Sequence, residues 1–169
     1  MKRFAIVLLL VGGTAAAQMS TPNLPQCNIS HVQGTYVATY QGWVAVPVPN
    51  AAPMLYPGAM MGVLSIGSTG AFTGTFTAIL PISGKTTNEV MPGGVVDIKP
   101  DCTGTVRFSI RGKGTSEAPT NEIHRLVYLR ERGEFMVIME VMERGGVQFI
   151  PMFRGSWKQL AKWPNEAEW

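Results

Sequence analysis

The residues of this sequence best suited to nucleophilic or metal chemistry are two cysteines and two histidines: Cys27, Cys102, His31 and His124. A catalytic cysteine reacts as its thiolate and needs a neighbouring base, which either histidine could supply. A structural zinc site needs four ligands, and none of these residues is paired at the short spacing that zinc sites use. We therefore expect no bound metal and no cofactor.

The N-terminal segment indicates where the chain works. Lys2 and Arg3 precede an apolar run over residues 4–11, and small residues follow at 15–17, a pattern typical of a secretory signal peptide cleaved before Gln18. The apolar run is too short to cross a bilayer, so we expect no transmembrane segment. The pattern predicts a secreted or periplasmic protein; a buried N-terminal helix is the alternative.

Export favours a structural interpretation of the cysteines. A secreted chain with an even number of cysteines forms disulfides by default, because its compartment is oxidising. A bond between Cys27 and Cys102 closes a loop of 75 residues. Loss of unfolded-state entropy through such a loop stabilises the fold by about 4 kcal/mol. We expect this disulfide rather than a reactive thiol.

Carboxylates offer the other route to catalysis. Glu140 interrupts an apolar strand, and inside an apolar barrel its raised pKa would let it act as an acid. The sequence favours the alternative, in which Glu140 faces solvent or pairs with Arg125 or Arg130. Asp97 and Asp101 flank a turn, where carboxylates usually cap backbone amides. Glu140 is thus the one catalytic candidate among the acids.

The histidines and the known motifs add little support for an enzyme. His31 follows Cys27 closely and is expected at the surface, and His124 lies in a strand beside Arg125, where it can face either water or the core. The sequence contains no phosphate-binding glycine loop, no Ser-His-Asp order and no metal-binding motif. A non-enzymatic protein is therefore favoured.

Charge is unevenly distributed along the chain. Without Lys2 and Arg3 the remaining chain carries 12 basic and 11 acidic side chains, and none of them lies between Gln18 and Gly84. Such a balance creates no general field to attract nucleic acid or anionic membranes, so we expect no nucleic-acid partner. The uncharged half stays soluble through small polar side chains or is covered by a partner, which leaves a homo-oligomer open.

Glycine and proline divide the chain into short runs rich in β-branched and aromatic residues, a pattern typical of an all-β sandwich or barrel. The predicted strands are 34–42, 59–66, 72–80, 85–91, 95–99, 103–111, 122–130, 134–143 and 147–154. Alternation predicts that six residues point into the interior: Tyr36, Phe72, Phe76, Val106, Phe108 and Ile110. We predict an antiparallel barrel of about eight strands, joined mostly by hairpins, with one disulfide and a short irregular or helical C-terminal tail.

Two segments depart from simple alternation. Residues 43–61 hold four prolines and no charge, so we expect their middle to be a long loop at the barrel mouth. Six of its residues could contact an apolar ligand or a partner: Trp43, Met54, Leu55, Tyr56, Met60 and Met61. The strand around residues 135–142 is apolar on both faces except at Glu140, which predicts cover by the C-terminal tail or, alternatively, by another subunit.

Three pieces of the chain resemble a known group of proteins. They are "CNISHVQGTY" at 27–36, "GVLSIGSTGAFTG" at 62–74 and "DCTGT" at 101–105. Together they are similar to small secreted bacterial proteins with a barrel like that of allene oxide cyclase and dirigent proteins, within or near the calycins. The resemblance covers residues 27–155 and implies an antiparallel barrel with an early-to-middle disulfide. It brings no active site, and the turn at 67–70 departs from the Asp-Gly-x-Gly usual in that group.

These observations predict four segments: a signal peptide at 1–17, a linker at 18–26, a barrel at 27–157 and a tail at 158–169. The favoured function is a secreted or periplasmic, non-enzymatic barrel that binds a small apolar ligand or a protein partner through residues 43–61. A cyclase or isomerase acting on an apolar substrate inside the barrel is the first alternative. A structural or assembly protein is the second.

Overall fold

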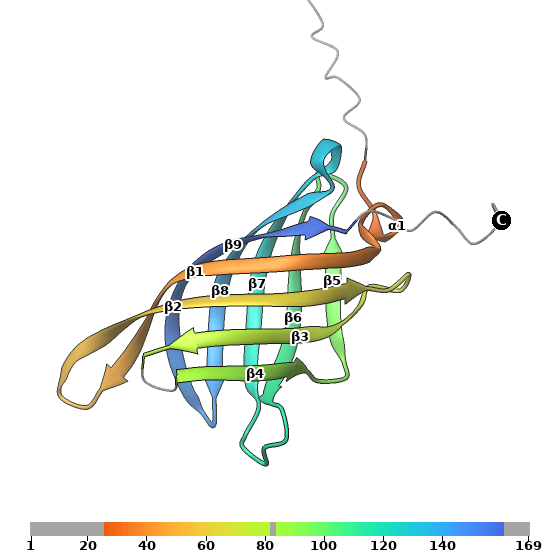
Figure 1. The fold of residues 1–169 in the computed structure, drawn as a ribbon. Coiled ribbons are helices and arrows are strands. Elements are labelled where there is room, and N and C mark those ends of the chain that lie inside the picture. The colour runs from red at the N-terminus through yellow and green to blue at the C-terminus, as the bar shows by residue number, and fades with distance from the viewer. Residues whose placement is uncertain (1–25, 82–83, 161–169) are drawn as a thin grey trace, which may run out of the picture.

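The computed structural model describes residues 26–81 and 84–160, so the predicted signal peptide lies outside the described residues. Strands dominate the described chain, and only one short α-helix is present in it (Figure 1). The elements in chain order are α1 (Ile29–Val32), β1 (Gly34–Val48), β2 (Ala51–Ile66), β3 (Ala71–Leu80), β4 (Gly84–Val90), β5 (Gly94–Ile98), β6 (Thr103–Gly112), β7 (Thr120–Leu129), the 3-10 turn η1 (Arg130–Arg132), β8 (Glu134–Arg144) and β9 (Val147–Gln159).

The strands close into an antiparallel barrel, which confirms the predicted fold class. Strand β1 pairs with both β2 and β9, and β2 pairs in turn with β3. Strands β4 and β5 both lie between β3 and β6, one after the other along the same part of the wall (Figure 1). The nine strands thus fill eight positions around the ring. Closure gives wall strands partners on both sides, which protects edges that would otherwise invite aggregation.

The interior of one half of the barrel is filled by aromatic side chains. Tyr36, Phe72, Phe135 and Trp157 come from four different strands, and each is at most 1% exposed. The ring centroids of Phe72 and Trp157 lie 5.4 Å apart, as do those of Tyr36 and Phe135. Aromatic pairs at this separation attract each other in addition to burying apolar area. This half of the barrel is therefore packed rather than hollow.

The residues predicted to point inward do so to different degrees. Five of them are buried in the core: Tyr36, Phe72, Phe76, Val106 and Phe108. Ile110 is half-buried, because it lies near the opposite end of the barrel, where the interior is not filled. Period-two alternation found the inner face of these strands, since successive side chains of a strand point to opposite sides.

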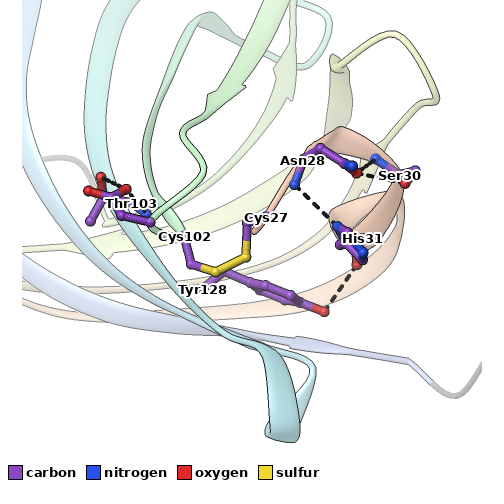
Figure 2. Close-up of a disulfide and its surroundings, with 8 residues drawn as sticks. Cys27, Asn28, Ser30, His31, Cys102, Thr103 and Tyr128 are labelled. Carbon is purple, nitrogen blue, oxygen red and sulfur yellow. Dashed lines mark hydrogen bonds between the residues drawn. A yellow bond between two sulfur atoms is a disulfide. The ribbon is translucent and has the colours of Figure 1, made fainter. Parts of the chain in front are cut away.

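The N-terminal residues close the packed end, as Figure 2 shows. The expected disulfide joins Cys27, just before α1, to Cys102 in the turn before β6, with Cα atoms 5.0 Å apart. Val32 of α1 is fully buried, and its carbonyl accepts a hydrogen bond of 2.6 Å from the Tyr36 hydroxyl. The His31 carbonyl accepts a second one, 3.2 Å long, from Tyr128. The helix thus acts as a plug that the disulfide holds in place.

The proline-rich segment is not a loop, and that prediction was wrong. Residues 43–61 form the outer part of a long β1–β2 hairpin, which projects beyond the barrel wall in Figure 1. Pairing of β1 with β9 stops at Ala45, and pairing of β2 with β3 stops at Ala59. Beyond these points each strand has one neighbour only, so a proline can face the free side without breaking a ladder. Pro47 lies in an irregularity of the register, between the paired residues Val46 and Val48.

Strand β8 alternates in the structure although its sequence does not. Phe135, Val137 and Met139 are buried inside the barrel, whereas Met136 and Ile138 are more than half exposed on its outer surface. Trp163 and Trp169, in the C-terminal tail that was expected to cover this strand, lie outside the described residues. Trp157 belongs to the interior, because β9 continues through it to Gln159.

Candidate ligand-binding site at the open end of the barrel

The end opposite the disulfide contains a cavity of about 530 Å³. Its walls are mainly apolar and come from strands all round the barrel; they include Val44, Met60, Leu80, Ile110, Met142 and Phe153. Threonines of β4 and charged residues of the β6–β7 connection and of β8 lie at the rim. One charged residue, Glu122 of β7, lines the cavity although it is only 3% exposed.

Strand β7 carries two ionisable residues into the barrel. Its inner face presents Glu122, His124, Leu126 and Tyr128, all buried, and Arg125 points outward. The spacing of two residues places Glu122 and His124 on the same face, one above the other. His124 is fully buried and its ring lies edge-on against Phe108, with centroids 4.9 Å apart. The strand therefore brings a carboxyl group and an imidazole into the interior side by side.

A chain of short hydrogen bonds runs from the packed half of the barrel to the cavity. Trp157 Nε1 donates to the Tyr40 hydroxyl at 2.7 Å. The Tyr40 hydroxyl lies 2.9 Å from His124 Nδ1. His124 Nε2 lies 2.8 Å from Glu122 Oε2. The four residues come from β9, β1 and β7, so only the closed barrel brings them together.

The donors and acceptors of this chain define where its protons lie. An indole nitrogen can only donate, so the Tyr40 oxygen accepts from Trp157 and its own proton is free to go to His124 Nδ1. A neutral imidazole that accepts at Nδ1 carries its proton on Nε2, which then donates to Glu122 Oε2. This order uses every donor and makes Glu122 the terminal acceptor, the role of a carboxylate.

Burial keeps the Tyr40 hydroxyl, in the middle of this hydrogen-bond chain, protonated. The Tyr40 side chain is shielded from water, which raises the pKa of its phenol well above the usual value, and the Trp157 N–H opposes this only in part. Desolvation disfavours the charged phenolate. Gly155 makes room for the ring, since a Cβ there would collide with the Thr39 carbonyl and with Tyr40 itself. Tyr40 therefore remains a hydroxyl that can both accept and donate.

One side-chain atom at the end of this hydrogen-bond chain is left without a partner. Glu122 Oε1 is buried, and no described residue forms a hydrogen bond with it. A buried polar atom without a partner loses the solvation it had in water, at a cost of about 1–3 kcal/mol. Because Glu122 lines the cavity, the missing partner can come from a molecule bound there. The site thus combines apolar walls with one unsatisfied acceptor at its floor.

The acid chosen from the sequence lies elsewhere. Glu140 is on the outer surface, where Arg125 Nε and Nη2 reach its two carboxylate oxygens at 2.9 and 3.0 Å. These hydrogen bonds lower the pKa of Glu140, so it does not have the raised value of an acid catalyst. It falls in a register irregularity, since Ile123 pairs with Val141 and His124 with Met139. Regular alternation along β8 places Glu140 outward, next to the buried Met139, which agrees with the favoured alternative of an arginine pair.

The other polar residues considered from the sequence have structural roles. Asp101 Oδ1 accepts from the Thr103 hydroxyl at 2.7 Å and from its backbone N–H at 3.0 Å, and these bonds lower the Asp101 pKa. His31 Nδ1 accepts from the Asn28 backbone N–H at 3.2 Å and so caps α1 (Figure 2). Neither lies at the cavity. Among the described residues, no group of three or more His, Cys, Asp or Glu is placed to hold a metal ion.

The six residues of the 43–61 segment divide between two surfaces. Met60 lines the cavity, and Tyr56 packs against the core from its edge. Trp43, Met54, Leu55 and Met61 are about half exposed or more, on the outer surface of the hairpin and wall. Trp43 lines a depression of about 1040 Å³ on the outer wall, together with the exposed Ile79, Ile138 and Met152. This depression is larger than the cavity and lacks a buried polar group, so we place the candidate site in the cavity.

Glu122, Tyr40 and Trp157 were not predicted as site residues from the sequence, and the orientation of His124 was left open. The spacing of Glu122 and His124 was visible and predicts a shared face. Which face is inside was not visible, because the opposite face of β7 also mixes polar and apolar residues, among them Arg125 and Val127. The partners on β1 and β9 are far away in the sequence, so no local pattern connects them.

Comparison with protein-family models finds no match, and neither does comparison with curated proteins. The assignment of a function therefore depends on the barrel and its site. In the part of the chain that the structure describes, no helix is long and apolar enough to cross a membrane. The disulfide is consistent with an extracellular or periplasmic location, because such bonds persist in oxidising compartments.

Proposed function

We propose that this protein is a binding module that holds a small, mainly apolar molecule in the open end of its barrel. The observation that carries this proposal is the apolar cavity with one buried, unpartnered carboxylate oxygen at its floor. Its volume of about 530 Å³ falls within the range of about 300–1,000 Å³ typical of small-molecule sites. Apolar walls supply affinity, and a single polar group orients the ligand.

The setting of this function is part of the proposal. We infer a secreted or periplasmic protein whose residues 1–17 are a cleaved signal peptide, and a barrel related to those of allene oxide cyclase and dirigent proteins. The disulfide and the barrel are compatible with both inferences. The proposed binding surface is the interior of the open end, and of the six residues predicted from the sequence it includes Met60.

The cavity can be tested with a pair of substitutions on one strand. Ala78 of β3 lines the cavity, and the next residue, Ile79, points outward and is exposed. Ala78→Phe fills part of the cavity, so we expect binding of the neutral apolar dye Nile red to weaken by about tenfold, or about 1.4 kcal/mol. Ile79→Phe adds an aromatic ring outside and should leave binding unchanged. Equal dye binding by both variants and the unmodified protein would exclude the cavity as the site.

An isomerase is the second candidate, favoured by the hydrogen-bond chain that ends at Glu122. A carboxylate held by His124 beside an apolar cavity could remove a proton from a ligand carbon next to a carbonyl group and return it at another carbon. The composition of the ligand is unchanged, so no co-reactant is needed. In deuterated water a ligand that co-purifies with the protein would gain deuterium at carbon, and Glu122→Gln would stop the exchange. Absence of exchange by the unmodified protein would exclude the isomerase and leave binding as the proposed function.

A further inference from the structure

The donor order of the hydrogen-bond chain leaves Glu122 as an acceptor, the role of a carboxylate, and no described lysine or arginine forms an ion pair with it. The charged residues around the cavity mouth are already paired. Arg144 Nη2 lies 2.6 Å from Glu117 Oε2, and Lys113 Nζ lies 3.6 Å from Glu89 Oε1. Among the described residues, the one ionisable group that forms a hydrogen bond with Glu122 is His124, which the donor order of the hydrogen-bond chain makes neutral. The floor of the cavity therefore holds an acidic group whose counter-charge is missing from the described residues.

A cationic His124 would neutralise Glu122 but would disrupt the rest of the chain. It would donate from Nδ1 to the Tyr40 oxygen, which already accepts from Trp157 Nε1. The Tyr40 proton would then have no acceptor among the described residues, in a fully buried place. A buried donor without an acceptor costs about as much as a lost hydrogen bond. The arrangement with a neutral imidazole satisfies all three donors, so the hydrogen bonds favour it.

We propose that the ligand carries an ammonium group, or a similar cationic N–H donor, on an apolar body, and that this group binds Glu122 Oε1. The inference rests on the proposed binding function and specifies its ligand class. An ammonium N–H supplies both things that the floor lacks, a donor for Oε1 and a positive charge. Charge-assisted hydrogen bonds of this kind are about twice as strong as neutral ones. Because Oε1 is itself buried, the contact requires a rotation of the carboxyl group about its terminal torsion, which is soft.

The remaining features of the site agree with a ligand of this class. Apolar residues such as Met60, Leu80 and Phe153 line the same cavity as Glu122 and would hold an alkyl or aromatic body. Methionine adapts to ligands of different shape, because its side chain is unbranched and flexible. An anion would be disfavoured, since its charge would approach Glu122 in a place shielded from water.

Four probes with the same alkyl chain test the proposal on the full chain: octylammonium, octanol, octanoate and octyltrimethylammonium. Calorimetric titration at neutral pH measures each affinity. We expect octylammonium to bind about 10- to 100-fold more tightly than octanol, the range for a hydrogen bond to a charged group. Octyltrimethylammonium, which has the charge but no N–H, should fall between the two, and octanoate should be weakest.

The variant Glu122→Gln keeps the shape of the side chain and removes its charge. We expect it to lose the preference for octylammonium and to bind octanol about as well as the unmodified protein does. Equal affinity of the unmodified protein for octanol and octylammonium would overturn the proposal, even if the variant failed to fold. If Ala78→Phe weakens the binding of octanol, the cavity still binds apolar molecules and only the cationic ligand class is rejected. If no probe binds and Ala78→Phe leaves the affinity for Nile red unchanged, the proposed binding function is wrong as well.

Discussion

The two ends of this barrel are built from the same strands, but one end is packed and the other contains a cavity. At the end near the disulfide, Tyr36, Phe72, Phe135 and Trp157 fill the interior, and α1 closes it. At the other end the same wall surrounds a cavity with Glu122 at its floor. One end supplies the apolar burial that stabilises a domain, and this allows the other to keep a hollow and an unsatisfied acceptor. Stability and the candidate site are thus separated along the barrel axis.

The sharpest test of this separation compares two aromatic truncations. Trp157→Ala should lower the free energy of unfolding by about 5 kcal/mol, near the upper end for such changes, because it leaves a large cavity and deprives Tyr40 of a donor. Phe149→Ala at the cavity should cost only about 1–2 kcal/mol, because this ring is half-buried. Chemical denaturation measures both. Equal losses would contradict a division into a structural end and a site end.

Removal of the disulfide should have the next largest effect and should act on stability alone. The double variant Cys27→Ser, Cys102→Ser loses a cross-link over 75 residues and should be less stable by about 4 kcal/mol. Nile red binding, measured well below the melting temperature, should stay the same because the cavity lies at the other end. A large loss of dye affinity in the folded double variant would show that the two ends depend on each other.

Alkaline pH should unfold the protein through its buried phenols. Burial raises the pKa of Tyr40 well above the usual value near 10. Below about pH 10 the phenol is protonated in both states; at higher pH the unfolded state loses its proton first. Stability should then fall by up to about 1.4 kcal/mol per pH unit for this group. Denaturation curves at several alkaline pH values should show a shallower fall for Tyr40→Phe, and an unchanged slope would refute the assignment.

The smallest effect is expected on the outer surface. Glu140→Gln breaks an exposed pair with Arg125 that solvent screens, so neither the melting temperature nor dye binding should change measurably. Glu122→Gln is the matched change inside the barrel and should alter probe preference. If Glu140→Gln affected binding more than Glu122→Gln did, the proposed site would be wrong.

The contrast between these two glutamates also shows how far sequence reasoning reached. Glu140 was noticeable because it interrupts an apolar run, yet the alternation of β8 places it on the outer surface. Glu122 was unremarkable at the start of an ordinary strand, yet the alternation of β7 carries it inside. Alternation assigns each acid to one face of its strand, but closure of the ring decides which face is inside, so local pattern alone could not identify the buried acid.

The proline-rich segment teaches a related lesson. Pro47 and its neighbours suggested a loop, because proline cannot donate to a central ladder. They are compatible with strands here because β1 and β2 extend beyond the strands that flank them, and each then has a free side. The position of a strand relative to its neighbours is a property of the closed barrel, and it was not available from the order of residues.

The sequence by itself determined the fold class, the pairing of its two cysteines and the inner face of strands such as β3 and β6. These features follow from local alternation, turn residues and cysteine count, which act over short distances or leave a single choice. Only the tertiary structure decided that one end is packed and the other hollow, and that Trp157, Tyr40, His124 and Glu122 form one hydrogen-bond chain. The physical reason is ring closure, which brings β1, β7 and β9 together around a shared interior.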